Sequence, residues 1–304
     1  MNNLIALVLV TYNRSVLLNE MLCSVLKQSI KPDHVYVIDN NSNDNTQEMV
    51  GHFIENNRIL LNISYHNTGA NLGGAGGFEF GSRLAYSDGY EWIWLADDDV
   101  VFASDCLANL LKHQETGDIL QPMRMNMDGS CAEISGIDYE INNLFRLNPK
   151  KKKITDIYDH EWETQEISTI PFEGPLINRR VFDKIGFPNQ DFFIFYDDLD
   201  FAIRANQAGY KIICVKSAKM ERKIKFVQSR ALTSWKGYFM YRNFFKVQLA
   251  YAKKPIGILR TLLIYLSVNF YSICTGEFKS VPILFYALRD ALNKNFPLDS
   301  RFKP

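Results

Sequence analysis

The sequence has no excess of charge of either sign, because 34 lysines and arginines balance 34 aspartates and glutamates over its 304 residues. That balance excludes a general nucleic-acid binder, which would need a strongly basic field. The five cysteines form no CxxC pair and no spacing typical of a disulfide framework or a zinc site, which fits a reducing cytosol. The apolar N-terminal run follows no basic residue and precedes no small-residue cleavage site, so we expect a buried strand there and not a signal peptide.

Two common nucleotide-phosphate loops are also missing. There is no GxGxxG after the first predicted strand and no GxxxxGK[ST], so neither a dinucleotide-binding fold nor a P-loop is predicted. The glycine-rich stretch NLGGAGGF at 71–78 leads into a predicted helix, where glycines permit close backbone approach and unpaired N–H groups attract anions. An ordinary tight connection between a strand and a helix explains this stretch nearly as well. The five histidines show no metal-binding spacing.

Hydrophobic residues make up 47% of the chain, enough to bury a large core. Short apolar runs rich in β-branched or aromatic residues alternate with segments of helical periodicity. This alternation predicts an α/β fold with a mostly parallel, Rossmann-like central sheet flanked by helices. Strands are predicted at 4–10, 34–39, 59–66 and 91–96, and helices at 15–27, 43–54 and 75–88.

Each of the four predicted strands ends in polar residues. The stretches are TYNR at 11–14, DNNSND at 39–44, NTGANLGGAGG at 67–77 and DDD at 97–99. In a parallel sheet the carboxyl ends of the strands point to one edge, where ligands of such folds bind. We therefore expect these four polar clusters to converge there.

The triple aspartate in WIWLADDDV, at 92–100, follows the most apolar of these strands. Burying unpaired carboxylates is costly, so a cation is expected beside them. If the backbone stays extended, Asp97 and Asp99 point to the same side and are the candidate ligands of Mg²⁺ or Mn²⁺, with Asp98 turned away or toward a nucleotide sugar. The alternative is that Asp98 or Asp99 caps a helix that starts near Ser104, although three acids exceed what capping requires.

Two later stretches also combine acidic or small residues with an apolar setting. In FFIFYDDLDFAIRANQAGYKI, at 192–212, three aspartates open a predicted helix, and a carboxylate near aromatic side chains suits a general base. The alternative is helix capping with an Asp200–Arg204 ion pair. In PFEGPLINRRVF, at 171–182, Gly174 either lets a ligand approach or is a plain turn glycine.

The last part of the chain differs in composition. The basic run NPKKKK at 148–153 predicts either a solvated hairpin turn or a contact with phosphate groups. From about residue 226 the sequence predicts long helices crowded with aromatic and basic residues. The stretch 256–276 is about as long as a membrane span but contains Arg260, which favours an interfacial amphipathic helix or a buried helix of an oligomer or subdomain. We predict a catalytic domain at 1–225 and a helical region at 226–304.

Taken together and in their order, LVLVTYNR, VIDNNSNDNT, NLGGAGGF, WIWLADDDV, FEGPLINRRVF and FFIFYDDLDFAIRANQAGYKI resemble the inverting family 2 glycosyltransferases of GT-A fold. These stretches span about residues 4–215. Within that family the triple aspartate after an aromatic strand and the glycine-rich loop look most like bacterial galactofuranosyltransferases and their rhamnosyltransferase relatives.

The resemblance implies a role for individual residues. It implies donor contacts from Thr11, Tyr12, Asn13, Arg14, Asp39 (to uracil), Asn71, Gly73, Gly74, Asp97 and Asp98, metal ligation by Asp97 and Asp99, an acceptor and sugar pocket at Gly174 and Asp197, and Asp198 as catalytic base. There is one departure. Many family members carry a metal-ligating histidine near the end of the strand after that helix, where this chain has Arg222, which is suited to neutralise a diphosphate.

The resemblance also implies a function. It indicates transfer of galactofuranose from UDP-galactofuranose to a hydroxyl of a lipid-linked glycan, with Mn²⁺ or Mg²⁺, in bacterial surface polysaccharide synthesis. A dTDP-rhamnose or UDP-hexopyranose transferase of the same fold is the alternative, followed by a non-catalytic sugar-nucleotide-binding scaffold. The aromatic, basic C-terminal helices would hold a cytoplasmic enzyme on the inner face of the cell membrane, or join the subunits of a homo-oligomer.

Overall fold

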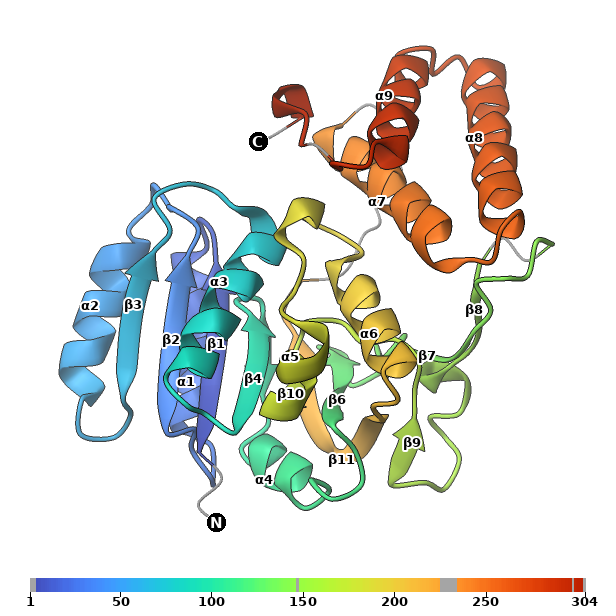
Figure 1. The fold of residues 1–304 in the computed structure, drawn as a ribbon. Coiled ribbons are helices and arrows are strands. Elements are labelled where there is room, and N and C mark those ends of the chain that lie inside the picture. The colour runs from blue at the N-terminus through green and yellow to red at the C-terminus, as the bar shows by residue number, and fades with distance from the viewer. Residues whose placement is uncertain (1–3, 146–147, 225–233, 297, 303–304) are drawn as a thin grey trace.

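The structure is a computed structural model that describes residues 4–145, 148–224, 234–296 and 298–302 (Figure 1). Strands and helices alternate through the first hundred residues, as the sequence predicts. In chain order the elements are β1 Ile5–Thr11, α1 Ser15–Leu26, β2 His34–Asp39, α2 Thr46–Asn57, β3 Ile63–Asn67, α3 Gly73–Ser87, β4 Trp92–Asp97, β5 Val100–Phe102, α4 Cys106–Leu111, β6 Ile119–Asn126, β7 Gly136–Tyr139, β8 Lys150–Lys153, β9 Thr164–Glu166, β10 Leu176–Asn178, α5 Arg179–Ile185, α6 Asp197–Gln207, β11 Ile212–Arg222, α7 Trp235–Tyr251, α8 Ile256–Cys274 and α9 Ser280–Leu292. Short 3₁₀ turns occupy Ile154–Asp156, Gln190–Phe192 and Ser300–Phe302.

The central sheet has nine strands in the order β3-β2-β1-β4-β10-β6-β11-β5, with β9 also paired to β11. Strands β3, β2, β1 and β4 are parallel, and so are β6 and β11. Strand β10 runs antiparallel between β4 and β6, and β5 and β9 run antiparallel to β11. The predicted mostly parallel sheet is confirmed, and β1 is buried along its whole length because helices cover both faces.

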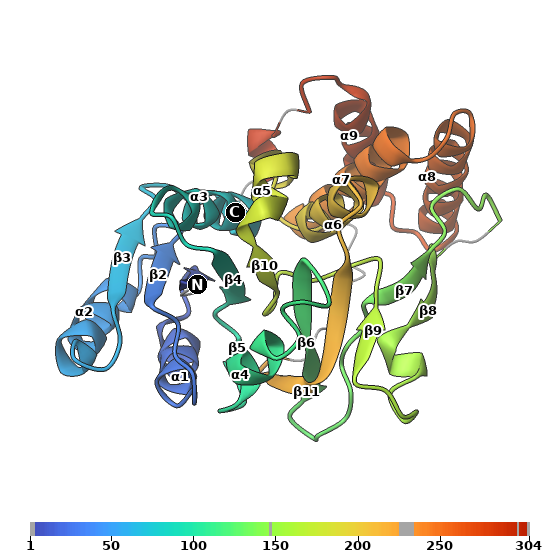
Figure 2. The same ribbon diagram turned by 60° about the horizontal axis from the view of Figure 1, so that its bottom comes forward.

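Helices α1, α2 and α4 cover one face of the sheet, and α3, α5 and α6 cover the other (Figure 2). Two separate hydrophobic cores follow from this layering. On the first face Leu18 and Phe53 pack against alternate strand residues such as Leu7. On the second face Phe78 and Phe201 pack against the intervening residues of the same strands. Successive side chains of a strand point to opposite faces, so the continuous apolar runs serve both cores.

The C-terminal helices α7, α8 and α9 form a group beside α6 and the 190–192 turn, on the side of the sheet toward which β1 runs (Figure 1). Phe193 packs on Tyr238 and Phe239 of α7, and Phe192 packs with Val247. A helical C-terminal extension is thereby confirmed. The predicted boundary between residues 225 and 226 lies outside the described residues, so the division into two domains stays a prediction.

Local differences from the predicted elements have physical causes. The third strand starts at Ile63 and not at 59, because the chain turns at the end of α2. Helix α3 starts at Gly73, inside the glycine-rich stretch, rather than at 75. The lysine run forms strand β8 of a two-stranded hairpin with β7, and is not the turn itself. Lys151 and Lys152 are exposed, whereas Lys150 and Lys153 at the two ends of the strand are half-buried.

Candidate active site

The strand register brings the predicted polar clusters to one edge of the sheet. Thr11 pairs with Asp39, and Asp39 pairs with Asn67, so the last residues of β1, β2 and β3 form one row. On the other side of β1, Val10 pairs with Asp97 at the end of β4. The four polar clusters therefore converge at the carboxyl edge of the sheet.

Arg14 is the cation beside the triple aspartate. Its Nη1 lies 2.9 Å from Asp98 Oδ1 and 3.2 Å from Asp99 Oδ2. The hydroxyl of Thr11 donates a 2.7 Å hydrogen bond to the other oxygen of Asp98. A guanidinium and a hydroxyl thus hold Asp98, which is buried.

The backbone turns directly after Asp97, so the extended geometry expected through Asp99 does not occur. Asp98 and Asp99 consequently both reach Arg14, and Asp98 is not turned away from Asp99. Capping does not explain these acids either, because β5 separates Asp99 from α4, and Asp105 occupies the residue before that helix.

The acidic cluster retains an excess of negative charge. Burial raises the pKa of Asp97 well above its ordinary value, and the carboxylates of Asp98 and Asp99 raise it further. Burial also raises the pKa of Asp98 to about 6, against the opposing effect of Arg14. One oxygen of Asp99 is buried without a hydrogen-bond partner. Such an oxygen suits a hard divalent cation.

Within the described residues no three histidine, cysteine, aspartate or glutamate side chains converge into a metal cage. A Mg²⁺-type site in a phosphate-transfer setting needs only one or two carboxylates, because the substrate phosphates and water supply the other oxygens. The donor set around Asp99 therefore fits such an ion, with part of its coordination left to the substrate.

The loop after β1 and the loop after β2 are tied together. The backbone N–H of Asn13 donates to Ser42 Oγ at 2.8 Å, and Asn13 Oδ1 accepts from the N–H of Asn43 at 2.8 Å. Asp39 is fully buried, and its carboxylate accepts from Tyr65 Oη at 2.6 Å and from the Ser42 N–H at 2.8 Å. Tyr12 is exposed at the mouth of this pair of loops.

Gly73 in the glycine-rich stretch is a position at which the fold itself requires glycine. Gly73 has φ +71°, and a Cβ at this position would lie 2.1 Å from the carbonyl oxygen of Phe193. Asn71 Oδ1 accepts from the Gly73 N–H at 2.9 Å, and Asn40 Nδ2 donates to the Gly73 carbonyl at 3.0 Å. A Cβ on Gly74 would meet no atom within 4 Å, so packing does not explain this second glycine.

Asp197 and Asp198 are the first two residues of α6. Burial raises the pKa of Asp198 to about 6, while the Leu199 N–H, which donates to its Oδ1 at 2.7 Å, and the cations Lys150 and Arg124 lower it. Burial and the charge of Asp198 raise the pKa of Asp197 well above its ordinary value. The Asp200–Arg204 pair also forms, at 2.8 Å, so this helix opening has both the predicted ion pair and the desolvated carboxylates.

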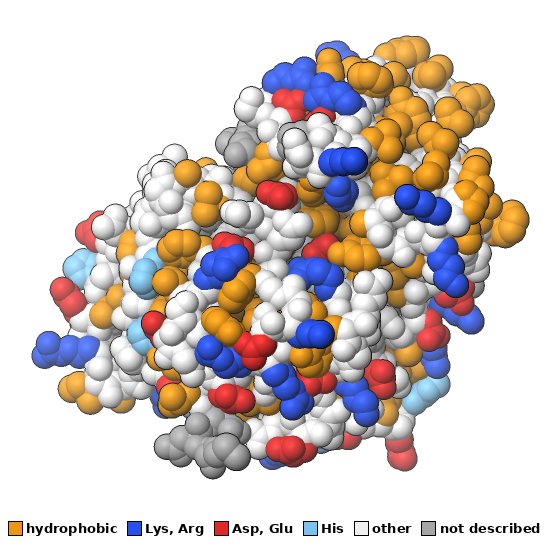
Figure 3. All heavy atoms as spheres, in the orientation of Figure 1, with side chains coloured by type: hydrophobic (Ala, Val, Ile, Leu, Met, Phe, Trp, Pro, Cys, Tyr) orange, Lys and Arg blue, Asp and Glu red, His pale blue; other side chains and the backbone are white. Residues whose placement is uncertain are grey.

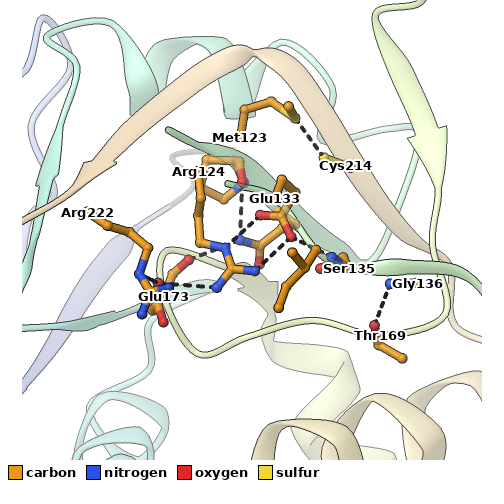
Figure 4. A network of polar contacts seen from close by, with 12 residues as sticks. Met123, Arg124, Glu133, Ser135, Gly136, Thr169, Glu173, Cys214 and Arg222 are labelled. Carbon is orange, nitrogen blue, oxygen red and sulfur yellow. Dashed lines mark hydrogen bonds and ion pairs between the residues drawn. The ribbon is translucent and has the colours of Figure 1, made fainter. Parts of the chain in front are cut away.

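Glu173 connects the two acidic groups, and the sequence alone did not single it out. Its Oε2 lies 3.0 Å from Arg222 Nε and 3.3 Å from Arg124 Nη1 (Figure 4). Its charge raises the pKa of both Asp97 and Asp198, so it lies within electrostatic range of each. The available signal was its place directly before Gly174 in an apolar stretch. Lys150 was not singled out either, because it lies within a run of similar lysines.

Gly174 has a structural reason to be glycine. Its φ is +90°, and a Cβ would lie 2.7 Å from Pro122 Cγ and 2.8 Å from Met220 Sδ. Its carbonyl accepts from Trp94 Nε1 at 2.8 Å. These contacts support the turn-glycine interpretation, and they fix the backbone from which the side chain of Glu173 projects.

Residues 6–186 match the family described as Glycosyl transferase family 2, which is more than half of the chain. The chain belongs to this family. Among curated proteins it is 29% identical over 210 residues to galactofuranosyltransferase GlfT1 of Mycolicibacterium smegmatis, covering 66% of this chain and 65% of that protein. It is 25% identical over 227 residues to the dTDP-rhamnosyl transferase RfbF of Shigella flexneri, covering 72% and 69%.

Solved structures share the fold of this family 2 chain. A mannosyltransferase of Pyrobaculum calidifontis, solved with GDP-mannose and Mn²⁺, has a TM-score of 0.57 at 18% identity and covers 95% of this chain and 74% of its own. TarS residues 1–349 of S. aureus, solved with UDP-GlcNAc, has a TM-score of 0.58 at 18% identity, covering 96% and 82%. The predicted GT-A fold is confirmed. The matched part spans less than two thirds of the length of the galactofuranosyltransferase relatives, at 65% and 40%.

Proposed function

We propose that this family 2 protein transfers a sugar from a nucleotide sugar to a hydroxyl group with inversion at the anomeric carbon. The observation that carries the proposal is the joint placement of the Asp97–Asp99 cluster and the half-buried Asp198, with Glu173 within electrostatic range of both. One acidic group suits the donor diphosphate and its cation, and the other suits proton removal from an acceptor. The roles of Thr11, Tyr12, Asn13, Asp39, Asn71 and Gly74 as donor contacts belong to this proposal.

A divalent ion, Mn²⁺ or Mg²⁺, would be held by Asp97 and Asp99. When bound, it supplies positive charge that stabilises the departing nucleoside diphosphate. Among the described residues, cations at this edge include Arg14, whose side chain is 41% exposed, and Arg222. Asp98 and Asp99 hold Arg14 through one guanidinium nitrogen, and we propose that its partly exposed side chain contacts the diphosphate.

Asp198 is the proposed general base. Its carboxylate takes the proton of the acceptor hydroxyl while that oxygen forms a bond to the anomeric carbon. The bond between this carbon and the diphosphate oxygen breaks, and the electron pair leaves with the nucleoside diphosphate. Attack from the face opposite the leaving group inverts the configuration, and no covalent intermediate with the protein forms. Asp197 and the backbone at Gly174 are proposed to line the sugar and acceptor pocket.

We propose UDP-galactofuranose as the donor and a lipid-linked glycan of surface polysaccharide synthesis as the acceptor. Support comes from the likeness to proteins named galactofuranosyltransferase GlfT1. A dTDP-rhamnose donor is the second candidate, because RfbF is named a dTDP-rhamnosyl transferase and matches a larger share of the chain. A UDP-hexopyranose donor is the third.

The C-terminal helices support a place at the inner face of the cell membrane. Helix α8 has a mean hydropathy of 1.5 and is, among the described helices, the one long and apolar enough to cross a bilayer. Arg260 in it is only 1% exposed and donates to the carbonyls of Ile141 and Asn143, which ties that part of α8 to the protein. The outer faces of α8 and α9 are apolar and exposed (Figure 3). We therefore propose that α8 lies on the membrane surface and does not span it.

The direct test is a panel of nucleotide sugars offered with a short lipid-linked acceptor and Mn²⁺, with release of UDP or dTDP as the readout. UDP-galactofuranose should give the highest kcat/KM, and chelation of the metal should abolish release. Preference for dTDP-rhamnose would select the second donor. Binding of nucleotide without release from any donor would instead indicate a non-catalytic scaffold.

A further inference from the structure

The chain takes an unusual backbone path just before Asp198. Phe193, Phe195 and Tyr196 have φ values of +64°, +65° and +68°, although none of them is glycine. Bulky side chains disfavour this left-handed region, so such a path persists only where surrounding contacts enforce it. Tyr196 immediately precedes Asp197, the first residue of α6. The direction in which the first turn of α6 points therefore depends on whatever holds this loop.

Asn243 of α7 holds it. The side-chain Nδ2 of Asn243 donates to the carbonyl oxygens of Phe192, Ile194 and Phe195 at 2.9, 2.7 and 2.9 Å. The three acceptors are carbonyls, which cannot donate, so the amide nitrogen must face them, and because it carries two N–H groups one of these is shared between two carbonyls. Arg242 Nη1 donates to the Oδ1 of Asn243 at 2.8 Å and fixes the amide from its other end. Asn243 is 0% exposed, so water does not compete for these bonds.

The same loop contacts both halves of the candidate site. The carbonyl of Phe193 accepts from the Ala75 N–H at 3.1 Å, within the first turn of α3 and next to Gly73. The carbonyl of Tyr196 accepts from the Asp200 N–H at 2.8 Å, within the first turn of α6. Loss of the Asn243 bonds would remove a donor from three carbonyls, of which that of Phe192 keeps the Ile194 N–H, and would release the loop between these two attachments.

We infer that Asn243, a residue of the C-terminal helical region, is a positioning residue that holds the loop before Asp198 and so sets the placement of that carboxylate. The inference rests on the proposed function and assigns the helical region a part in the reaction besides any contact with a membrane. Asn243 itself touches neither the acidic cluster nor, in this scheme, the substrates.

The test compares Asn243→Ala with Asn269→Ala. Asn269 lies on α8, and its amide donates to the Tyr265 carbonyl of its own helix, so it is a control for losing an amide in the same region. We expect Asn243→Ala to lower kcat at least about tenfold, the effect of losing roughly one well-placed hydrogen bond in the transition state. The dissociation constant of UDP should change by less than about threefold, because the Thr11–Asp39 side of the site is untouched, whereas the KM of the donor should rise through the loosened contact between Phe193 and Ala75. Asn269→Ala should leave all three values unchanged.

A change of the pH profile separates positioning from plain loss of fold. In the wild type Asp198 is surrounded by Asp197, Lys150, Arg124, Glu173, Tyr139 and Tyr196. A loosened loop admits water to Asp198 and lowers its pKa, so the acid limb of kcat/KM should move to lower pH in Asn243→Ala. Asn243→Ser keeps one donor and should restore part of kcat. An unmoved acid limb, with a kcat loss equal to the loss of folded protein, would overturn the inference.

Hydrogen exchange reports on the order of the loop in the absence of any substrate. Amides of residues 190–200 should lose protection in Asn243→Ala while those of β1 and β2 keep theirs, and Asn269→Ala should exchange like the wild type. Unchanged protection at 190–200 would contradict the inference even if kcat fell. If the wild type transferred no sugar at all, the proposed function would fail, whereas the exchange result would still decide whether Asn243 holds the loop.

Discussion

The Nε of Arg222 lies 3.0 Å from the Oε2 of Glu173, at the end of β11 beside the acidic cluster. Register places Arg222 opposite Val100, directly after Asp99, and the N–H of Lys223 donates to the Asp99 carbonyl at 2.9 Å. Arg222 therefore stands next to the proposed metal ligands, but its charge is engaged by a carboxylate. Glu173 orients the Arg222 guanidinium toward this edge. A bound diphosphate would either share this guanidinium with Glu173 or displace Glu173 from it.

Arg222→Ala should raise the KM of the donor between about tenfold and a hundredfold, because a hydrogen bond to a charged group contributes roughly 1.5–3 kcal/mol. The effect should be measured by initial rates of UDP release across donor concentrations. Lys223→Ala is the matched control, since this neighbouring cation pairs with Glu20 and Glu221. Equal KM values for both variants would show that Arg222 does not contact the donor.

The two neighbouring glycines of the donor loop should respond differently to alanine. Gly73→Ala places a Cβ against the Phe193 carbonyl at positive φ, so we expect it to destabilise the protein by about 1–3 kcal/mol or more. Gly74→Ala meets no atom and lies in a helix, so stability should be unchanged or slightly higher. Urea unfolding of both variants provides the comparison. If Gly74→Ala is stable but has a raised donor KM, the backbone at Gly74 contacts the sugar-nucleotide as proposed.

Much of the proposed donor side could be predicted from the sequence because it depends on strand ends. Apolar runs followed by polar residues locate Thr11, Asp39 and Asp97, and parallel pairing alone brings them together. The partners of these residues were harder to predict from the sequence. Arg14 was noted as a pocket residue, but its contact with Asp98 joins positions far apart in the chain, which periodicity does not report.

The acceptor side depended still more on tertiary contacts. Glu173 reaches Asp97 and Asp198 only because β10 inserts antiparallel between β4 and β6, an order that the alternating pattern does not predict. Asn243 lies in a region that looked like a membrane or subunit contact by composition, and its three bonds to the 192–195 loop follow from how α7 packs. Side chains whose role is to hold another segment leave no local signal in the sequence.

The activity should have an acid limb set by Asp198. Burial raises the pKa of this carboxyl to about 6, and a general base acts only in its deprotonated form. Under saturating metal, kcat/KM should be full well above pH 6 and should fall about tenfold per pH unit as the pH drops below it. The profile should be recorded with a donor whose own ionisation lies outside this range. An acid limb below pH 5 would contradict Asp198, with its raised pKa, as the base.

The outer face of α8 should bind membranes through its apolar side chains. Leu262 and Leu266 are 44% and 61% exposed, and replacing both with glutamate should weaken binding to vesicles that contain phosphatidylglycerol at least about tenfold. Ile59→Glu is the control, because this side chain is 91% exposed but follows α2, away from the C-terminal helices. Co-sedimentation with vesicles gives the comparison. If the double variant instead dissociates an oligomer and vesicle binding is unchanged, this face is a subunit contact.

The most direct test of the account is Asp198→Asn. This change keeps the size of the side chain and removes its ability to accept a proton, so sugar transfer should fall by at least about a hundredfold, the usual contribution of a general base. The dissociation constant of UDP with Mn²⁺, measured by calorimetry, should stay within about twofold of the wild type. Asp138→Asn, on the exposed face of the neighbouring hairpin, should change neither quantity. Transfer retained by Asp198→Asn would contradict the assignment of this carboxylate as the base.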